Sequence, residues 1–153
     1  MGEQLAIRVA TQGDFEAWSV LWAGYNTFYG RHGATALAAE ITNMTWARFF
    51  DAYEPVNALV AELDGQLVGL VHYVFHRSTT LIAPTCYLQD LFTSEAARGR
   101  GVGTKLIEAV YAKAREAGSP RVYWLTHETN HTAMRVYDQV AERSGFLQYR
   151  KML

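Results

Sequence analysis

A glycine-rich segment in the second half of the chain most restricts how the chain can fold. Residues 98–104 read Arg98-Gly99-Arg100-Gly101-Val102-Gly103-Thr104, and they lie between a strand-like run and a helical pattern. Glycines at alternate positions leave the backbone N–H groups uncovered, and the start of a helix adds unsatisfied donors and a partial positive charge. With its two arginines, the segment predicts a strand-to-helix loop that holds a pyrophosphate.

The spacing of this loop indicates which pyrophosphate ligand it suits. A nucleoside triphosphate loop needs Gly-Lys-Ser/Thr, but here Lys105 follows Gly103-Thr104. A dinucleotide fingerprint needs its third glycine one residue later. The spacing Arg98-x-x-Gly101-x-Gly103 instead resembles the acyl-CoA loop of the GCN5-related N-acetyltransferase (GNAT) family. The resemblance implies that residues 98–104 bind acetyl-CoA, the acyl-donor co-substrate of that family.

A second pattern of the same family follows the loop. The residues Asn130-x-x-Ala133-x-x-x-Tyr137 and then Gly145-Phe146 match the family pattern, with an interval before Gly145 that is about one helical turn longer than the common form. Residues 87–146 resemble in particular the yeast branch that is named for histone and polyamine acetylation. Asn130 is also a good residue to cap a helix through its side-chain oxygen.

Hydrophobic periodicity and turn residues predict a mixed α/β architecture. Expected strands cover residues 5–10, 57–63, 66–76, a run ending at Thr93, 121–126 and 146–153, and expected helices cover residues 13–28, 35–50, 101–117 and a segment from Asn130. Asp64-Gly65 is a strong hairpin signal. The order β-α-α-β-β-β-α-β-α-β predicts one domain over residues 1–153. It is also the order of the GNAT fold, which implies a mixed, mostly antiparallel sheet of about six to seven strands with helices on both faces.

The resemblance assigns the co-substrate contacts to three segments. In that family, backbone N–H groups of the strand before the loop polarise the acetyl carbonyl, which here implies Leu91 or Phe92. Such donors need no reorganisation when negative charge develops on the oxygen. The full implied set is Leu91, Phe92 and Thr93 on the strand, residues 98–104 in the loop, and Asn130 and Tyr137 on the following helix.

Tyr137 is the residue that we expect to protonate the departing thiolate. A phenol with a pKa of about 10 keeps its proton at neutral pH and can donate it. Ala133, Tyr137 and Val140 share a helical stripe, so a tyrosine packed in the core is the alternative.

The attacking amine must be neutral, and an alkylammonium with a pKa of about 10.4 is only about one thousandth neutral at pH 7. Asp90 is expected to act as the base or to hold the substrate cation. The alternative is a structural role, in which the carboxylate caps a helix or forms a salt bridge. Residues 87–92 resemble the polyamine acetyltransferases, which carry Leu-Glu-Asp there, but Gln89 replaces the first carboxylate. Glu128 is a second carboxylate near the expected cleft, and His127 is a further candidate for a base or substrate contact.

Aromatic residues of the first helix are candidates for the acceptor site. In the family, the break between the first two helices overhangs that site, which implies Tyr25, Tyr29 and His32. Aromatic faces suit an ammonium group. Trp18, Trp22, Tyr25 and Tyr29 also follow helical spacing, so packing against the sheet is the alternative.

Composition excludes several other classes of protein. Half of the 153 residues are hydrophobic and the net charge is −1, which argues against nucleic acid as a partner. The one cysteine, Cys86, cannot form an internal disulfide and is expected to be buried, and no Cys/His spacing indicates a metal site. No apolar run is long enough to span a bilayer and no secretory signal is visible, so we expect a cytoplasmic protein with no membrane association.

Three functions are compatible with these residues. The favoured one is an acetyl-CoA-dependent N-acetyltransferase that transfers an acetyl group to a primary amine of a small molecule, such as a polyamine or an amino acid, by direct attack on the thioester. The alternatives are acetylation of a protein lysine or N-terminus, and a non-catalytic acetyl-CoA sensor, which the presence of Tyr137 disfavours.

Assembly is the last expectation. Residues 146–153 alternate like a half-buried strand and would form an exposed edge of the sheet. We therefore expect a symmetric homodimer with this strand at or near the interface. The alternative is a monomer whose edge is protected by Arg150 and Lys151.

Overall fold

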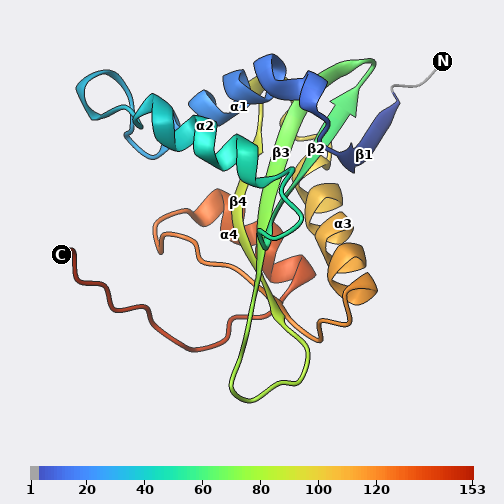
Figure 1. Ribbon diagram of the computed structural model, residues 1–153, viewed down its shortest axis with the longest axis vertical. Coiled ribbons are helices and arrows are strands. Elements are labelled where there is room, and N and C mark those ends of the chain that lie inside the picture. Colours follow the sequence, from blue (N-terminus) through green and yellow to red (C-terminus); the bar gives the residue numbers. More distant parts are fainter. Residues whose placement is uncertain (1–3) are drawn as a thin grey trace.

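The computed structural model describes residues 4–153 and combines one sheet with helices on both of its faces (Figure 1). The elements in chain order are β1 (Leu5–Val9), α1 (Phe15–Phe28), α2 (Ala39–Arg48), β2 (Val56–Leu63), β3 (Gln66–His76), β4 (Thr85–Thr93), α3 (Val102–Glu116), β5 (Val122–Tyr123) and α4 (His131–Val140). Short 3₁₀ turns precede α1, α2 and α3. Within residues 4–153, none of these helices combines the length and apolar composition needed to cross a bilayer.

The sheet has five strands in the order β1-β2-β3-β4-β5 across the described residues. Neighbouring strands are antiparallel except β4 and β5, which are parallel. The turn between β2 and β3 uses Asp64 at φ 50° and Gly65 at φ 83°, as a two-residue hairpin turn requires. The mixed, mostly antiparallel sheet predicted from the sequence is confirmed.

Successive side chains of β2 pack in two separate cores, because successive residues of a strand point to opposite faces of the sheet. Ala58 and Val60 pack with Trp18 and Leu70 in the layer under α1. Leu59 and Ala61 join the core under α3 on the other face, where the most buried residues include Val71, Cys86, Leu88, Leu106, Ile107 and Val110. Cys86 is fully buried, as expected, and burial raises the pKa of its thiol to about 11.

The C-terminal part of the chain differs from the sequence-based prediction. The expected strand 121–126 is reduced to Val122–Tyr123, and the expected strand 146–153 does not form, so the sheet has five strands and not six to seven in the described residues. Residues 141–153 extend away from the body in Figure 1. A strand needs a neighbouring backbone as well as an alternating pattern, and β5 is too short to offer that neighbour.

Candidate active site

The glycine loop enters α3 through two residues in the left-handed region. Gly99 has φ 79° and Gly101, the N-cap of α3, has φ 77°. A Cβ atom at Gly99, Gly101 or Gly103 would meet no described protein atom within 4 Å. The first intrahelical bond runs from the Lys105 N–H to the Gly101 carbonyl at 3.1 Å. The N–H groups of residues 102–104 thus lie at the open start of the helix, next to an uncovered backbone surface.

Arginines on the two sides of Gly99 have different environments. Arg98 folds back onto β4, where its Nε donates to the Thr93 carbonyl at 3.2 Å and its guanidinium carbon lies 5.8 Å from the centre of the Phe92 ring. Arg100 lines a hollow next to β1 together with Val102 and Lys105. Arg98 therefore ties the loop to the end of β4.

A bulge interrupts β4 shortly before Leu91 and Phe92, the residues expected to polarise the acetyl carbonyl. His72 of β3 pairs with Asp90 and Tyr73 pairs with Leu88, which leaves Gln89 as the extra, exposed residue. A bulge bends its strand and redirects side chains. On the other side of β4, pairing with β5 covers only Cys86 and Tyr87. The segment from Leu88 to Thr93 consequently has no strand beside it on that side among the described residues.

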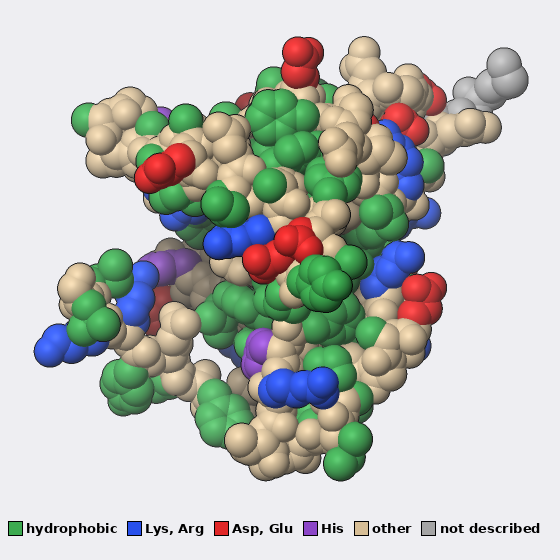
Figure 2. All heavy atoms as spheres, in the orientation of Figure 1, with side chains coloured by type: hydrophobic (Ala, Val, Ile, Leu, Met, Phe, Trp, Pro, Cys, Tyr) green, Lys and Arg blue, Asp and Glu red, His purple; other side chains and the backbone are tan. Residues whose placement is uncertain are grey.

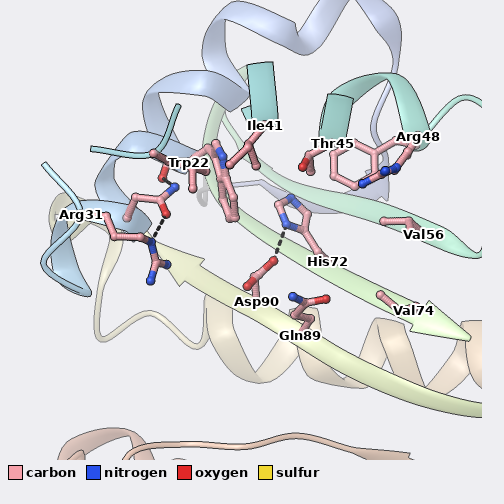
Figure 3. Close-up of a pocket in the computed structure, with 13 residues that line it drawn as sticks. Trp22, Arg31, Ile41, Thr45, Arg48, Val56, His72, Val74, Gln89 and Asp90 are labelled. Carbon is pink, nitrogen blue, oxygen red and sulfur yellow. Dashed lines mark hydrogen bonds and ion pairs between the residues drawn. The ribbon is translucent and has the colours of Figure 1, made fainter. Parts of the chain in front are cut away.

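A buried chain of hydrogen bonds holds the Asp90 carboxylate. Trp18 Nε1 donates to His72 Nε2 at 3.0 Å, and His72 Nδ1 lies 2.9 Å from Asp90 Oδ2. The indole N–H can only donate, so Nε2 of His72 is the acceptor and the ring proton is on Nδ1, directed at Asp90. Trp18 is fully buried and His72 is 2 % exposed. Figure 3 shows the His72–Asp90 contact from β3 to β4. Sequence analysis did not assign His72, because no local spacing links residues 18, 72 and 90.

Four of the expected site residues come together next to this chain. Burial, followed by the charge of Asp90, raises the pKa of Tyr25 and of Tyr29. Burial, followed by the proximity of Tyr29, raises the pKa of Tyr137 to about 12. Tyr25 and Tyr29, whose ring centres are 4.9 Å apart, thus lie near Asp90 and Tyr137 lies near Tyr29, so that these residues form one centre although they are up to 112 positions apart in the chain.

Tyr137 presents a protonated phenol to this centre. Its ring packs edge-on against Trp124, with 5.4 Å between centroids and 71° between planes. Within residues 4–153, no protein group hydrogen-bonds the hydroxyl, and its raised pKa keeps the proton in place at neutral pH. The side chain can therefore serve as a proton donor as well as a core residue.

A pocket of about 440 Å³ opens beside Asp90, between α1, α2 and the sheet. Its wall is apolar at Ile41, Phe49 and Val56 and charged at Arg31, Arg48 and Asp90. Figure 2 shows this face of the molecule hollowed below the α1–α2 layer, with histidine and charged side chains at the hollow. Such a pocket suits a small ligand with both polar and apolar parts.

Comparison with known proteins decides the family. The model of the acetyltransferase (GNAT) family matches residues 18–141. The chain belongs to this family. D-amino-acid N-acetyltransferase HPA3 of Saccharomyces cerevisiae is 34% identical over 153 residues, which cover 99% of this chain and 92% of the relative. An uncharacterised N-acetyltransferase of Bacillus subtilis, YhfO, is 29% identical over 94% of both chains. The structure of AAC(6')-Iy with a bisubstrate analogue has a TM-score of 0.81 at 19% identity, covering 98% of this chain and 99% of that one.

The chain is therefore an N-acetyltransferase, and acetyl-CoA is its acyl donor. The glycine loop fits this co-substrate, because its uncovered backbone and the start of α3 provide the space and the donors that a pyrophosphate needs. The unpaired edge of β4 from Leu88 to Thr93 can accept an added strand-like group such as the pantetheine arm. The N-acetyltransferase thus combines a loop and a strand edge that fit the co-substrate with a pocket lined by Asp90.

Two residues expected in the site of this acetyltransferase lie elsewhere or act differently. His127 is exposed in the loop before α4, where its Nδ1 is 2.7 Å from Thr129 Oγ1, and it does not line the pocket. Asn130 stands at the N-cap position of α4, but its side chain makes no capping bond and donates instead to Thr126 Oγ1 at 3.4 Å. The capping role expected for Asn130 is wrong, because the amide is engaged with the preceding loop. The substrate role of His127 stays a prediction.

Proposed function

We propose that this N-acetyltransferase transfers an acetyl group to the primary amine of a small molecule. The observation that carries the proposal is the pocket of about 440 Å³, which places Asp90 at the wall of a space sized for a small molecule. The relative at 34% identity is named for D-amino acids, so a D-amino acid is the first acceptor to consider.

Asp90 is proposed to receive the acceptor amine and to take up its proton, directly or through water. The neutral His72 ring donates to one carboxylate oxygen of Asp90, and Trp18 fixes that ring from behind. Because both supporting side chains are buried, the carboxylate is held in one orientation.

The other proposed roles divide between the backbone and one phenol. Acetyl-CoA supplies an activated acetyl thioester when bound. The backbone N–H groups of Leu91 or Phe92 stabilise negative charge on the acetyl oxygen, and Tyr137 donates a proton to the departing sulfur. The residues of the loop, from Arg98 to Thr104, and Asn130 bind the donor away from the reacting atoms.

A panel of amines tests the proposed function. We expect release of CoA from acetyl-CoA with at least one small primary amine, drawn from D- and L-amino acids, polyamines and aminoglycosides, and no release with a peptide lysine. Thiol detection measures the release, and mass spectrometry of the acceptor identifies the amide formed. Activity with the peptide alone would assign a protein acetyltransferase, and CoA binding without acetylation of any amine would assign a sensor.

We also propose a homodimer that uses the C-terminal segment. Its apolar side chains have no cover within the chain: Phe146 is 91% exposed, Leu147 83% and Tyr149 94%. A contiguous exposed apolar surface of this kind marks an interaction site. Figure 2 shows hydrophobic side chains gathered on the projecting segment. The same residues alternate with polar ones, as a strand added to another chain would require.

Removal of residues 147–153 should convert the dimer into a monomer. The expected mass by light scattering at micromolar concentration falls from two chains to one, because the deleted segment carries the exposed apolar side chains. The triple variant Phe146→Ser, Leu147→Ser and Tyr149→Ser should have the same effect. A matched change at the polar positions, Gln148→Ser with Arg150→Ser, should leave the dimer intact. A wild-type mass of one chain refutes the dimer, and a dimer that survives the deletion places the interface elsewhere.

A further inference from the structure

Positively charged side chains outnumber negatively charged ones in the wall of the pocket. Two arginines, Arg31 and Arg48, line the pocket with a single carboxylate, that of Asp90, and the buried Trp22 Nε1 has no hydrogen-bond partner among the described residues. Figure 3 shows Arg31 and Arg48 at opposite ends of the pocket with His72 and Asp90 between them. The pocket therefore offers more donors than acceptors to a bound molecule.

Arg31 is held in a fixed orientation by three neighbours. Its Nε donates to Asn26 Oδ1 at 2.6 Å, and the Asn26 amide, 4% exposed, donates in turn to the Trp22 carbonyl at 2.9 Å. The guanidinium carbon lies 5.8 Å from the centre of the Tyr25 ring and 5.6 Å from that of Tyr29. These contacts use the inner edge and the faces of the guanidinium.

The outer edge of the same guanidinium remains available. Among residues 4–153, no group is hydrogen-bonded to the two terminal nitrogens of Arg31, and no ion pair joins it to Asp90. Arg48 differs, because its Nε is paired with Glu54 at 3.8 Å and its side chain is 46% exposed. A planar guanidinium whose two terminal nitrogens form one free edge matches a carboxylate in bidentate geometry.

We propose that Arg31 binds the carboxylate of the acceptor, so that the substrate class is a free amino acid whose amine faces Asp90. This inference rests on the proposed small-molecule acetyltransferase function. Arg31, held over the Tyr25 and Tyr29 rings, and Asp90 line the same pocket, so the carboxyl and amino groups of one small molecule can be received together. A polyamine or an aminoglycoside carries several cations. Arg31 would repel them, and Asp90 is the one carboxylate in the wall that could pair with them.

The test compares D-leucine with D-leucinamide, which lacks the carboxylate charge, as acceptors of wild-type and variant enzymes. The apolar wall at Ile41 and Phe49 suits the leucine side chain. We expect Arg31→Gln to lower kcat/KM for D-leucine about 10–100-fold, mainly through KM, and to leave D-leucinamide within about twofold. Arg31→Lys should recover only part of the loss, because an ammonium lacks the fork.

Arg48→Gln is the matched control and should change the ratio between the two acceptors by less than about threefold, since Glu54 already pairs with Arg48. Equal loss for both acceptors in Arg31→Gln, or a wild-type enzyme that prefers the amide, would overturn the carboxylate site while leaving acetyl transfer in place. If no amine is acetylated, the proposed function fails first. Calorimetry of D-leucine with the CoA-bound protein then decides: binding to wild type and not to Arg31→Gln supports the site, and equal or absent binding overturns it.

Discussion

Replacement of Gly101 by valine should abolish binding of acetyl-CoA. Gly101 lies at φ 77° at the start of α3, and a side chain there would project into the space next to the free N–H groups of the helix. That space is open in the protein, so the side chain would displace the pyrophosphate and not a protein atom. Isothermal calorimetry with CoA should show a loss of affinity beyond the measurable range.

Two further variants separate this effect from backbone strain. Gly118 has φ 76° at the other end of α3, so Gly118→Val carries the same strain, of about 1–2 kcal/mol, far from the loop. It should destabilise the protein equally and still bind CoA. Gly103→Val adds a side chain to the loop without a positive φ and should weaken binding in a stable protein. Wild-type CoA affinity in folded Gly101→Val and Gly103→Val proteins would remove the loop from the donor site.

Replacement of Tyr137 by phenylalanine should lower kcat by about 10²–10⁴-fold, because it removes a proton donor and keeps the ring. The ring contact with Trp124 does not involve the hydroxyl, so CoA affinity and folding should change little. Since burial raises the pKa of Tyr137 to about 12, the acid form persists through neutral pH and is lost only as the pH rises through that value. Single-turnover rates at saturating acetyl-CoA measure the chemical step directly.

Tyr111→Phe provides the comparison. The Tyr111 hydroxyl donates to the Val140 carbonyl at the end of α4 at 2.8 Å, so its removal should cost stability of about 1 kcal/mol and leave the rate unchanged. A Tyr137→Phe enzyme with the wild-type single-turnover rate would return Tyr137 to a purely structural role. A rate loss of the same size in both variants would indicate a general disturbance of α4.

The fold could be predicted where the signals are local. The hairpin at Asp64-Gly65 formed as expected because two adjacent residues determine that turn. The end of the chain shows the limit of such reasoning. Residues 146–153 have the alternation of a strand, yet a strand forms only beside another backbone, and they pair with no strand of residues 4–153. The same pattern therefore becomes an exposed segment, to which we assign a partner chain.

The sequence by itself predicted the donor side that we propose for this acetyltransferase. The glycines and the helix start uncover backbone N–H groups and the two arginines add positive charge, all within seven consecutive residues, so their spacing can be read directly. On the acceptor side the sequence named Asp90, Tyr25 and Tyr29 as candidates, but only the tertiary structure showed how Asp90 is held and which other side chains line the pocket. Trp18, His72 and Asp90 are joined across α1, β3 and β4, and Arg31 is oriented by a turn that brings it back onto Asn26. Contacts between side chains on separate elements leave no periodic mark along the chain, because their geometry exists only once the helices have packed on the sheet.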